Sequence, residues 1–347
     1  MAAMAPKVTI RDVARAAGVS VATVSRALNT PDQVTAALRE RVSRAASRLG
    51  YVVHGAARAL ASRRSGAMGA LFPTLNNPIF ATCIDAFQRR LDEHGYSLLV
   101  ASADYDAARE TRELRTLLER GVDGVMLIGA EHAEESWALL RRGPPAVLVW
   151  TQEGGALALP AIGFDNQAAA RRVAEHLLGL GHRRIGMIAG ITRGNDRAAA
   201  RVAGVREALH AAGLSLDAAG LTERPYTVPD GLAGIRHLMA QPQPPTAVIC
   251  GNDHLALGAI TGARALGVAV PEALSVTGFD DLDFAACAVP PLTTVRVPAA
   301  EMGRRAADHL AALAAGEAPP PPVALEAPIV LRGTTARPPR RVGLARA

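Results

Sequence analysis

From residue 67 onward, the sequence alternates short apolar runs with stretches of helical periodicity. We predict strands at 68–72, 97–101, 124–128 and 146–150, with helices near 79–93, 106–120 and 133–142. Strands that alternate with helices lie parallel in one sheet, because each crossover helix returns the chain to the same edge. The pattern therefore predicts an α/β fold built on a doubly wound parallel sheet.

A second series of the same kind begins at 161–165 and continues through strands at 184–189, 222–226, 247–250 and 275–279. The helices between them are expected near 167–179, 196–212, 230–240 and 253–266. A proline-rich turn at 290–294, a helix near 299–314, a proline run at 319–322 and a last strand at 327–331 indicate that the chain crosses between two lobes more than once. We expect a hinged core at 66–335, with an N-lobe at 66–161 plus 292–321 and a C-lobe at 162–291 plus 322–335.

The N-terminal region has a different pattern, that of two short helices joined by a forced turn. Thr9 and Asp12 form a capping-box start, and Gly18 stands where a helix ends in the left-handed conformation. Ser20 caps the second helix, which buries Val24, Ala27 and Leu28 and leaves outward Val21, Ala22, Thr23, Ser25 and Arg26. Such a helix can lie in the major groove of DNA. From spacing alone, an ordinary helical hairpin fits equally well.

The charge distribution favours the DNA-binding interpretation. Residues 1–64 hold eleven Lys and Arg against three Asp and Glu, a net charge of +8, whereas the whole chain of 347 residues carries +6. The remainder therefore sums to about −2, and the basic character is confined to the N-terminal region. A localised positive charge indicates a polyanionic partner.

A third helix, with Leu38, Val42, Ala45 and Leu49 on one face, completes a predicted headpiece at 6–53. The segment 54–65 is basic and lacks an apolar stripe, so it is predicted as a linker that folds on binding. Its one large apolar side chain, Leu60, suits a wedge in a DNA minor groove and equally suits a loose linker. A basic tail at 336–347 ends the chain.

Several classes of site find no support in the sequence. Cys83, Cys250 and Cys287 are far apart and show no metal-ligand spacing. No nucleotide-binding glycine motif, nucleophile elbow or metalloprotease motif is present, so we expect no enzyme, no cofactor and no metal. Neither a signal peptide nor an apolar run of ~20 residues is found, which predicts a cytoplasmic protein with no membrane partner.

These features together resemble the lactose/galactose-repressor (LacI/GalR) family of bacterial transcription regulators, over about 8–335. The resemblance rests on ordered motifs: Asp12-Val-Ala, Gly18-Val-Ser, Thr23-Val-Ser-Arg26, Leu49-Gly-Tyr51, Phe164-Asp-Asn166, Gly181-His-Arg183, Arg201-Val-Ala-Gly204, Asn252-Asp253, Gly278-Phe-Asp-Asp281 and Pro290-Pro-Leu-Thr-Thr294. It implies a helix-turn-helix headpiece, a hinge helix that orders on operator DNA, and a two-lobed core like that of periplasmic sugar-binding proteins.

The resemblance also implies the site residues. The family's DNA-contacting positions fall on Ser20, Val21, Ala22, Thr23, Ser25, Arg26 and Asn29, and its minor-groove leucine falls on Leu60. Its effector-binding positions, between the lobes, fall on Phe80, Trp150, Arg201, Tyr226, Asn252 and Asp280. Aromatic faces, a guanidinium fork and polar caps suit a sugar or sugar acid.

Two departures limit what the resemblance implies. Trp150 stands where many members carry Asp, so the identity of the effector does not transfer. The tail lacks the apolar heptads of a tetramerising coil, which favours a homodimer. The main expectation is a repressor of a carbohydrate or sugar-acid utilisation operon, which binds double-stranded operator DNA and is released allosterically by its effector. The alternatives are a corepressor-dependent regulator with a non-sugar ligand, a binding-only sugar receptor and a dinucleotide-dependent enzyme.

Overall fold

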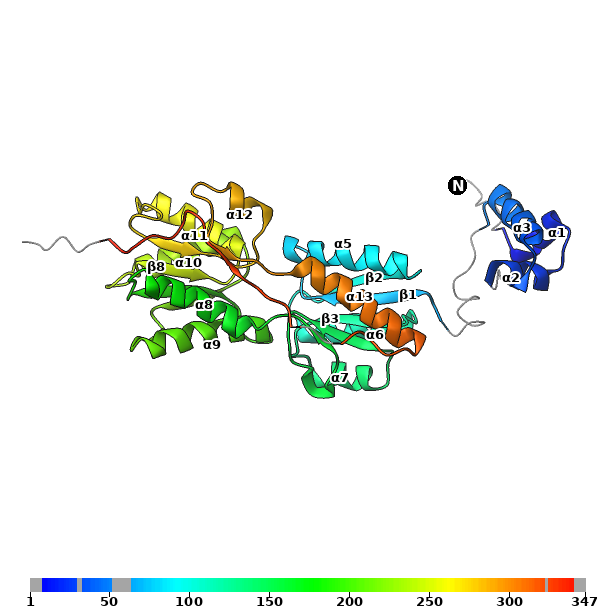
Figure 1. The fold of residues 1–347 in the computed structure, drawn as a ribbon, viewed down its shortest axis with the longest axis horizontal. Coiled ribbons are helices and arrows are strands. Elements are labelled where there is room, and N and C mark those ends of the chain that lie inside the picture. Colours follow the sequence, from blue (N-terminus) through cyan, green and yellow to red (C-terminus); the bar gives the residue numbers. More distant parts are fainter. Residues whose placement is uncertain (1–7, 30–32, 52–63, 322–323, 340–347) are drawn as a thin grey trace, which may run out of the picture. The chain divides into compact units, whose positions relative to one another are not determined.

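The computed structural model describes residues 8–29, 33–51, 64–321 and 324–339, without the side chain of Asn29 (Figure 1). Contacts between Cα atoms divide the chain at Gly66 into two units. We call them the headpiece, up to Gly66, and the core, from Ala67 onward. The predicted linker falls almost wholly outside the described residues, as does Leu60.

The headpiece consists of α1 (Ile10–Ala17), α2 (Val21–Asn29) and α3 (Ala36–Leu49). Asp12 accepts hydrogen bonds from the backbone N of Thr9 at 3.0 Å and from its hydroxyl at 2.7 Å, which fixes the start of α1. Gly18 ends α1 in the left-handed conformation at φ 64°. Val13, Val24 and Val42, one from each helix, are fully buried together and hold the three helices in one small core.

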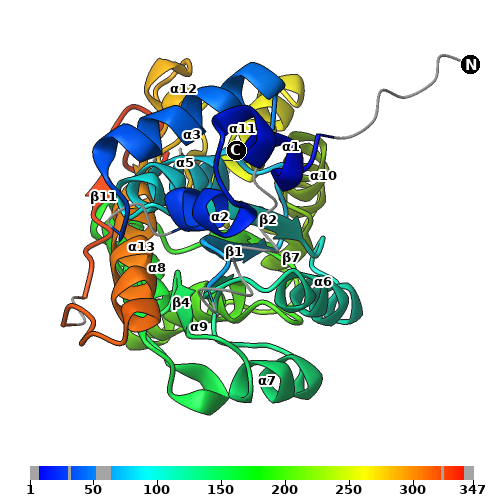
Figure 2. The same ribbon diagram turned by 90° about the vertical axis from the view of Figure 1, so that its right-hand side faces the viewer.

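The first sheet of the core contains β1 (Ala67–Phe72), β2 (Ser97–Ser102), β3 (Val125–Ile128), β4 (Ala146–Val149) and β5 (Ala161–Ile162). All pairs are parallel, in the order β2-β1-β3-β4-β5. Helices α5 (Pro78–Glu93) and α13 (Ala299–Ala315) cover one face, and α6 (Ala107–Glu119) and α7 (Glu134–Arg141) cover the other (Figures 1 and 2). Burial on both faces explains why β3 and β4 are apolar throughout.

The second sheet contains β6 (Ile185–Gly190), β7 (Leu221–Arg224), β8 (Ala247–Cys250) and β9 (Ser275–Thr277), all parallel in the order β7-β6-β8-β9. Its helices are α8 (Asn166–Gly179), α9 (Asp196–Ala211), α10 (Val228–Met239) and α11 (Asp253–Ala265). In both sheets the strand order reverses beside the first strand of the lobe. Ligands bind at such a reversal, outside the carboxyl ends of the strands. The predicted doubly wound fold is confirmed.

Two features at the lobe boundaries differ from the sequence prediction. The run at 161–165 was expected to open the C-lobe, but Ala161 and Ile162 pair with β4 and complete the first sheet. The return to the N-lobe was placed at residue 292, but Thr293 forms a bridge with Thr277 beside β9. Both errors concern the partner of a short strand, which periodicity along the chain does not encode.

The crossing segments are tied together by β10 (Thr294–Val295) and β11 (Ile329–Val330), which pair antiparallel. Between them α13 returns to the N-lobe and packs along α5. A single-turn 3₁₀ helix, η2 (Gly155–Leu157), and the short α12 (Asp283–Cys287) complete the elements of the core. Among the described residues, no helix combines the length and the apolar character that crossing a membrane requires.

Candidate functional site: the outer helix of the headpiece and the cavity between the lobes

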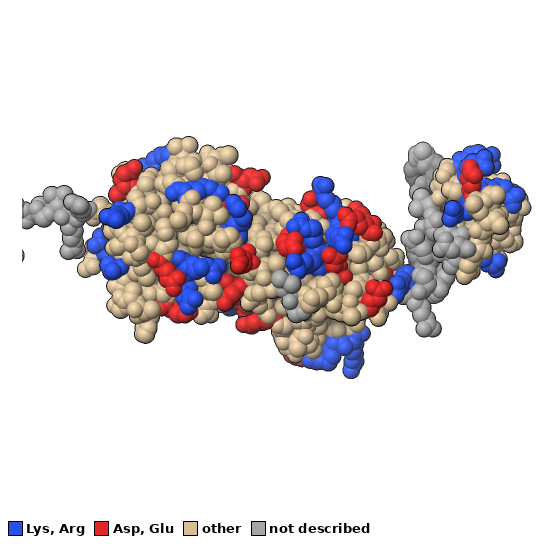
Figure 3. Space-filling model, viewed as in Figure 1, with Lys and Arg blue, Asp and Glu red and all other residues tan. Residues whose placement is uncertain are grey.

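Helix α2 presents a face that the headpiece core does not use. The Ser20 hydroxyl accepts a hydrogen bond from the backbone N of Thr23 at 3.1 Å and therefore caps the helix. Val21 is 40% exposed, and Ala22 and Arg26 are exposed beside it. Thr23 and Ser25 are half-buried at the edge of this face. Lys and Arg side chains, with a smaller acidic patch, lie on the visible surface of the headpiece (Figure 3). Helix α2 itself contains Arg26 and no acidic residue.

In the core, the structure brings six residues chosen from the sequence to one cavity. Its volume is about 30 Å³, and it is lined by Phe80, Trp150, Arg201, Tyr226, Asn252 and Asp280, together with Asn77, Ile79, Tyr105, Asn195 and Arg197. The lining comes from both lobes, and most of these residues follow the carboxyl ends of strands. Trp150 directly follows β4, and one residue, Gly251, separates Asn252 from the end of β8. The topology therefore brings distant parts of the sequence to one place.

Arg201 is the most constrained side chain in the cavity. It lies on α9, is 6% exposed, and donates from Nε to Asn166 Oδ1 at 3.0 Å and from Nη1 to the Gly251 carbonyl at 2.8 Å. Its guanidinium carbon lies 3.6 Å from the centre of the Phe279 ring, a cation–π contact. Burial lowers the pKa of Arg201. Because its rotamer is fixed by neutral groups, the positive charge is presented to the cavity in a preset position.

Asp280 is held in a strained backbone conformation, with φ 121°. Its backbone N donates to the Val295 carbonyl at 2.9 Å, so the crossing segment holds it in place. The side chain is buried, and burial raises its pKa from the ordinary 3.8 to about 8 against the opposing effect of Arg201. Asp280 Oδ2 and Asn252 Nδ2 have no hydrogen-bond partner. Two buried polar atoms thus remain available to a ligand.

Aromatic rings form the other part of the cavity. Phe80 meets Trp150 edge to face, with ring centroids 5.1 Å apart. Across the cavity, the Tyr105 and Tyr226 rings lie with centroids 6.3 Å apart. Trp150 has φ 64°, which turns its ring out of the line of β4. The site therefore combines flat apolar faces with directed polar groups, as ligand pockets do.

A polar bridge joins the lobes beside the cavity. Asp196 Oδ2 accepts from the backbone N of Ala130 at 2.7 Å, and Arg197 Nη1 donates to the Ile128 carbonyl at 3.1 Å. Asp196 and Arg197 also pair with each other at 2.7 Å. A Cβ atom on Gly129 would lie 1.9 Å from Arg197 Nη1, so only glycine permits this approach. We call these contacts the lobe bridge.

The sequence analysis missed five residues of the cavity: Asn77, Ile79, Tyr105, Asn195 and Arg197. Asn77 and Asn195 had a detectable signal, because each precedes a predicted helix as its N-cap and follows a strand. Tyr105 had none, since Asp104 and Tyr105 adopt successive left-handed conformations, at φ 50° and 58°, in a turn that no local motif marks. Asn29 is a helix residue whose side chain lies outside the description.

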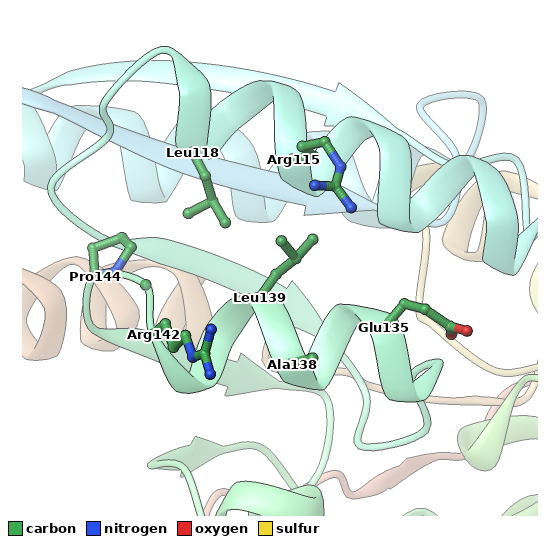
Figure 4. Close-up of a pocket in the computed structure, with 8 residues that line it drawn as sticks. Arg115, Leu118, Glu135, Ala138, Leu139, Arg142 and Pro144 are labelled. Atoms are coloured by element: carbon green, nitrogen blue, oxygen red, sulfur yellow. The ribbon is translucent and has the colours of Figure 1, made fainter.

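A larger hollow lies elsewhere, between α6 and α7 of the N-lobe (Figure 4). Its volume is about 640 Å³, and its lining residues include Arg115, Leu118, Glu135, Leu139 and Arg142. None of the predicted site residues lines it. Within the described ranges, no three His, Cys, Asp or Glu side chains are grouped to hold a metal ion.

Comparison with known proteins accounts for both parts of the chain. Residues 9–53 match the bacterial regulatory proteins of the lacI family, and residues 174–335 match the periplasmic binding protein-like domain. The transcriptional regulator GntR of Pseudomonas aeruginosa is 38% identical over 314 residues, covering 89% of this chain and 90% of that protein. The transcriptional repressor CytR of Escherichia coli is 34% identical over 298 residues, covering 86% and 87%.

A solved structure extends the match to nearly the whole chain. The Lac repressor dimer bound to operator and the anti-inducer ONPF is 28% identical, with a TM-score of 0.83, over 95% of this chain and 99% of that one. Identity above 30% over most of the length, with both domains in order, identifies the family. The chain belongs to the lacI family of bacterial regulatory proteins, and it is a transcriptional regulator rather than an enzyme.

Proposed function

We propose that this chain is a repressor that binds operator DNA as a homodimer in the cytoplasm and is released by a small polyhydroxylated effector, a sugar or sugar acid. The observation that supports control by an effector is the cavity between the lobes, whose lining includes all six residues that the sequence analysis assigned to effector binding. A regulator of this family with such a cavity has both a means of binding DNA and a means of sensing a ligand.

The proposed DNA contacts lie on α2 and the linker. Val21, Ala22 and Arg26 read base edges in the major groove. Ser20, Thr23, Ser25 and Asn29 bind phosphate or position the helix, and Leu60 enters the minor groove. One headpiece reads one half-site, so a homodimer requires a pseudo-palindromic operator. The exposure of Val21, Ala22 and Arg26 supports this assignment.

The proposed effector contacts are Phe80, Trp150, Arg201, Tyr226, Asn252 and Asp280. A cavity of about 30 Å³ holds roughly one water molecule, so an effector enters only when the lobes separate. A ligand that touches both lobes favours one lobe angle over another. Operator affinity then changes by the difference in the ligand's affinity for the two states, typically ~1–3 kcal/mol.

The proposal is tested in two steps. Selection from a random DNA pool with the full chain gives the operator, and fluorescence anisotropy on that operator is then repeated with a panel of sugars, sugar acids and nucleobases. We expect a selected pseudo-palindrome and at least one ligand that weakens binding in the wild type but not in Arg201→Ala. The proposal is contradicted if no DNA sequence is enriched. It is also contradicted if the ligand response survives in all three of Arg201→Ala, Asn252→Ala and Asp280→Ala.

A further inference from the structure

Three asparagines cap the helices that begin at the cavity. Asn77, Asn195 and Asn252 are the N-caps of α5, α9 and α11, and all three line the cavity. In each, the side-chain carbonyl accepts a hydrogen bond from a backbone N of its own helix, at 3.2, 3.3 and 2.9 Å. Because the carbonyl oxygen serves the helix, the amide NH₂ is the group that each cap has left for other partners.

The choice of asparagine is specific to the cavity. Asp106 and Asp165 cap α6 and α8, and neither lines the cavity. Asn and Asp cap helices about equally well, and the positive end of the helix dipole favours the charged residue. The first turns of α9 and α11 do contain Asp196 and Asp253, but both carboxylates have other partners. Asp196 accepts from the Ala130 backbone N in the lobe bridge, and Asp253 accepts from the Leu282 backbone N. The caps at the cavity therefore keep donors there and keep negative charge out.

The amide of Asn252 is the donor without a partner. The residue is 1% exposed, and its Nδ2 makes no hydrogen bond although it lines the cavity. A buried donor without an acceptor costs ~1–3 kcal/mol, which a ligand acceptor recovers. Burial raises the pKa of Tyr226 against a smaller opposing effect of Asn195, so the Tyr226 hydroxyl keeps its proton.

The charged groups of the cavity point to the same ligand chemistry. Arg201 binds only neutral groups and the Phe279 ring, and it has no ion pair within 4.0 Å in the described part of the chain. The single carboxyl group, Asp280, is protonated over most of the neutral range, since its pKa is raised to about 8 by burial. As an acid it donates a hydrogen bond. Buried guanidinium, amide and carboxylic acid groups together call for acceptors and negative charge.

We propose that the effector is an organic anion that also carries hydroxyl groups, bound through its anionic group by Asn252 and Arg201, and not a neutral sugar. The inference rests on the proposed function, since it specifies the ligand of the same cavity. The hydroxyl groups meet Asp280 and Tyr226, and Phe80 and Trp150 pack against the carbon chain.

A first experiment measures the charge preference of the cavity without knowing the ligand. The chain has two tryptophans, so Trp137→Phe leaves Trp150, in the cavity wall, as the only indole. Quenching of Trp150 by iodide, by caesium and by neutral acrylamide is measured at equal ionic strength, and each quencher reaches the ring only when the lobes separate. We expect the iodide quenching constant, scaled to acrylamide, to exceed the caesium constant roughly threefold to tenfold, because a positive potential of roughly half to one kT attracts the anion and repels the cation. Equal constants, or a caesium preference, overturn the proposal.

A matched pair of substitutions ties that preference to the cap. Asn252→Asp keeps an oxygen for the Leu255 backbone N and replaces the free donor with a negative charge, whereas Asn76→Asp adds the same charge at an exposed position. Helical circular dichroism and thermal unfolding establish that both variants fold. The iodide preference is expected to fall at least about twofold in Asn252→Asp and to remain in Asn76→Asp. Equal responses in the two variants overturn the assignment to Asn252.

A second experiment uses ligands matched in carbon chain and differing in charge: an aldose, its alditol, its aldonic acid and its phosphate ester. Thermal stabilisation of the wild type by an aldonic acid or a phosphate ester, but not by the alditol, supports the proposal and distinguishes the two kinds of anion. Stabilisation by the neutral members to an equal extent overturns it. An anion that stabilises the protein without changing operator affinity leaves this inference intact and refutes the proposed effector control instead.

Discussion

The lobe bridge gives a quantitative prediction for Asp196→Ala. The substitution removes the acceptor of the Ala130 N–H at 2.7 Å and the partner of Arg197 at 2.7 Å. The first contact joins the two lobes, and the second orients Arg197 toward the Ile128 carbonyl at 3.1 Å. Loss of both contacts in Asp196→Ala is therefore expected to favour separation of the lobes.

The magnitude follows from the charge and exposure of the bridge. A hydrogen bond to a carboxylate contributes ~1.5–3 kcal/mol. The Asp196 side chain is 25% exposed, so solvent screening places the value near the lower end. Asp196 also stabilises the start of α9, but this effect is present whether the lobes are together or apart and cancels. We expect a shift of about 1–2 kcal/mol, a fall of roughly 5- to 30-fold in the ratio of closed to open molecules.

Hydrogen exchange at the Ala130 amide and acrylamide quenching of Trp150 measure this shift. Both are expected to increase in Asp196→Ala. The control is Asp165→Ala, which removes the α8 cap, a 2.8 Å bond to the Ala168 backbone N within its own lobe, and leaves the lobe bridge alone. If quenching rises equally in both variants, general loosening explains it. If neither probe changes in Asp196→Ala, the bridge does not hold the lobes together.

Three further predictions concern other parts of the molecule. Arg26→Ala should weaken operator binding by ~1–3 kcal/mol and relax the preference at one symmetric base pair, measured by anisotropy on operator variants. The free energy of unfolding should fall as pH rises from about 4 to about 8, because the folded state holds the Asp280 proton more tightly than the unfolded chain. Urea titrations over this pH range measure the fall, and in Asp280→Asn the contribution of Asp280 to the pH dependence should be absent. Gly204→Ala should lower the free energy of unfolding by about 3 kcal/mol or more, because its Cβ atom would lie 2.0 Å from the Gln167 carbonyl oxygen. The control Gly179→Ala, in open space on α8, should raise it by ~0.5–1 kcal/mol, and thermal unfolding measures both changes.

The sequence was sufficient for the longer helices and strands of the core and their order, because their signals are local. The run Ala247–Cys250 is apolar throughout and was predicted as a strand with the same bounds that the structure gives. The family resemblance is confirmed, and it supplied six of the residues that line the cavity. They come from both lobes, so no local pattern could have gathered them.

The remainder depends on contacts between distant segments. Ala161 and Ile162 carry no sign of whether they pair with β4 or open the next sheet, and only the pairing decides it. Tyr105 reaches the cavity through a left-handed turn held by its backbone N, which donates to the Pro73 carbonyl at 3.1 Å. The lobe bridge likewise requires that Gly129 and α9 meet, which neither segment encodes alone.

The position of α13 has a consequence for how the protein is made. This helix packs along α5 (Figure 1). The approach is so close that a Cβ atom on Gly303 would lie 2.4 Å from the Cys83 carbonyl oxygen, and Met302 and Leu310 are fully buried. During synthesis the first sheet emerges from the ribosome well before α13, while the entire C-lobe is still being translated. Until then the flank of α5 that α13 contacts, at the Cys83 carbonyl and the Phe87 backbone N, has no cover. We therefore expect the nascent chain to be prone to aggregation over that interval, and truncation before residue 299 to expose the same surface permanently.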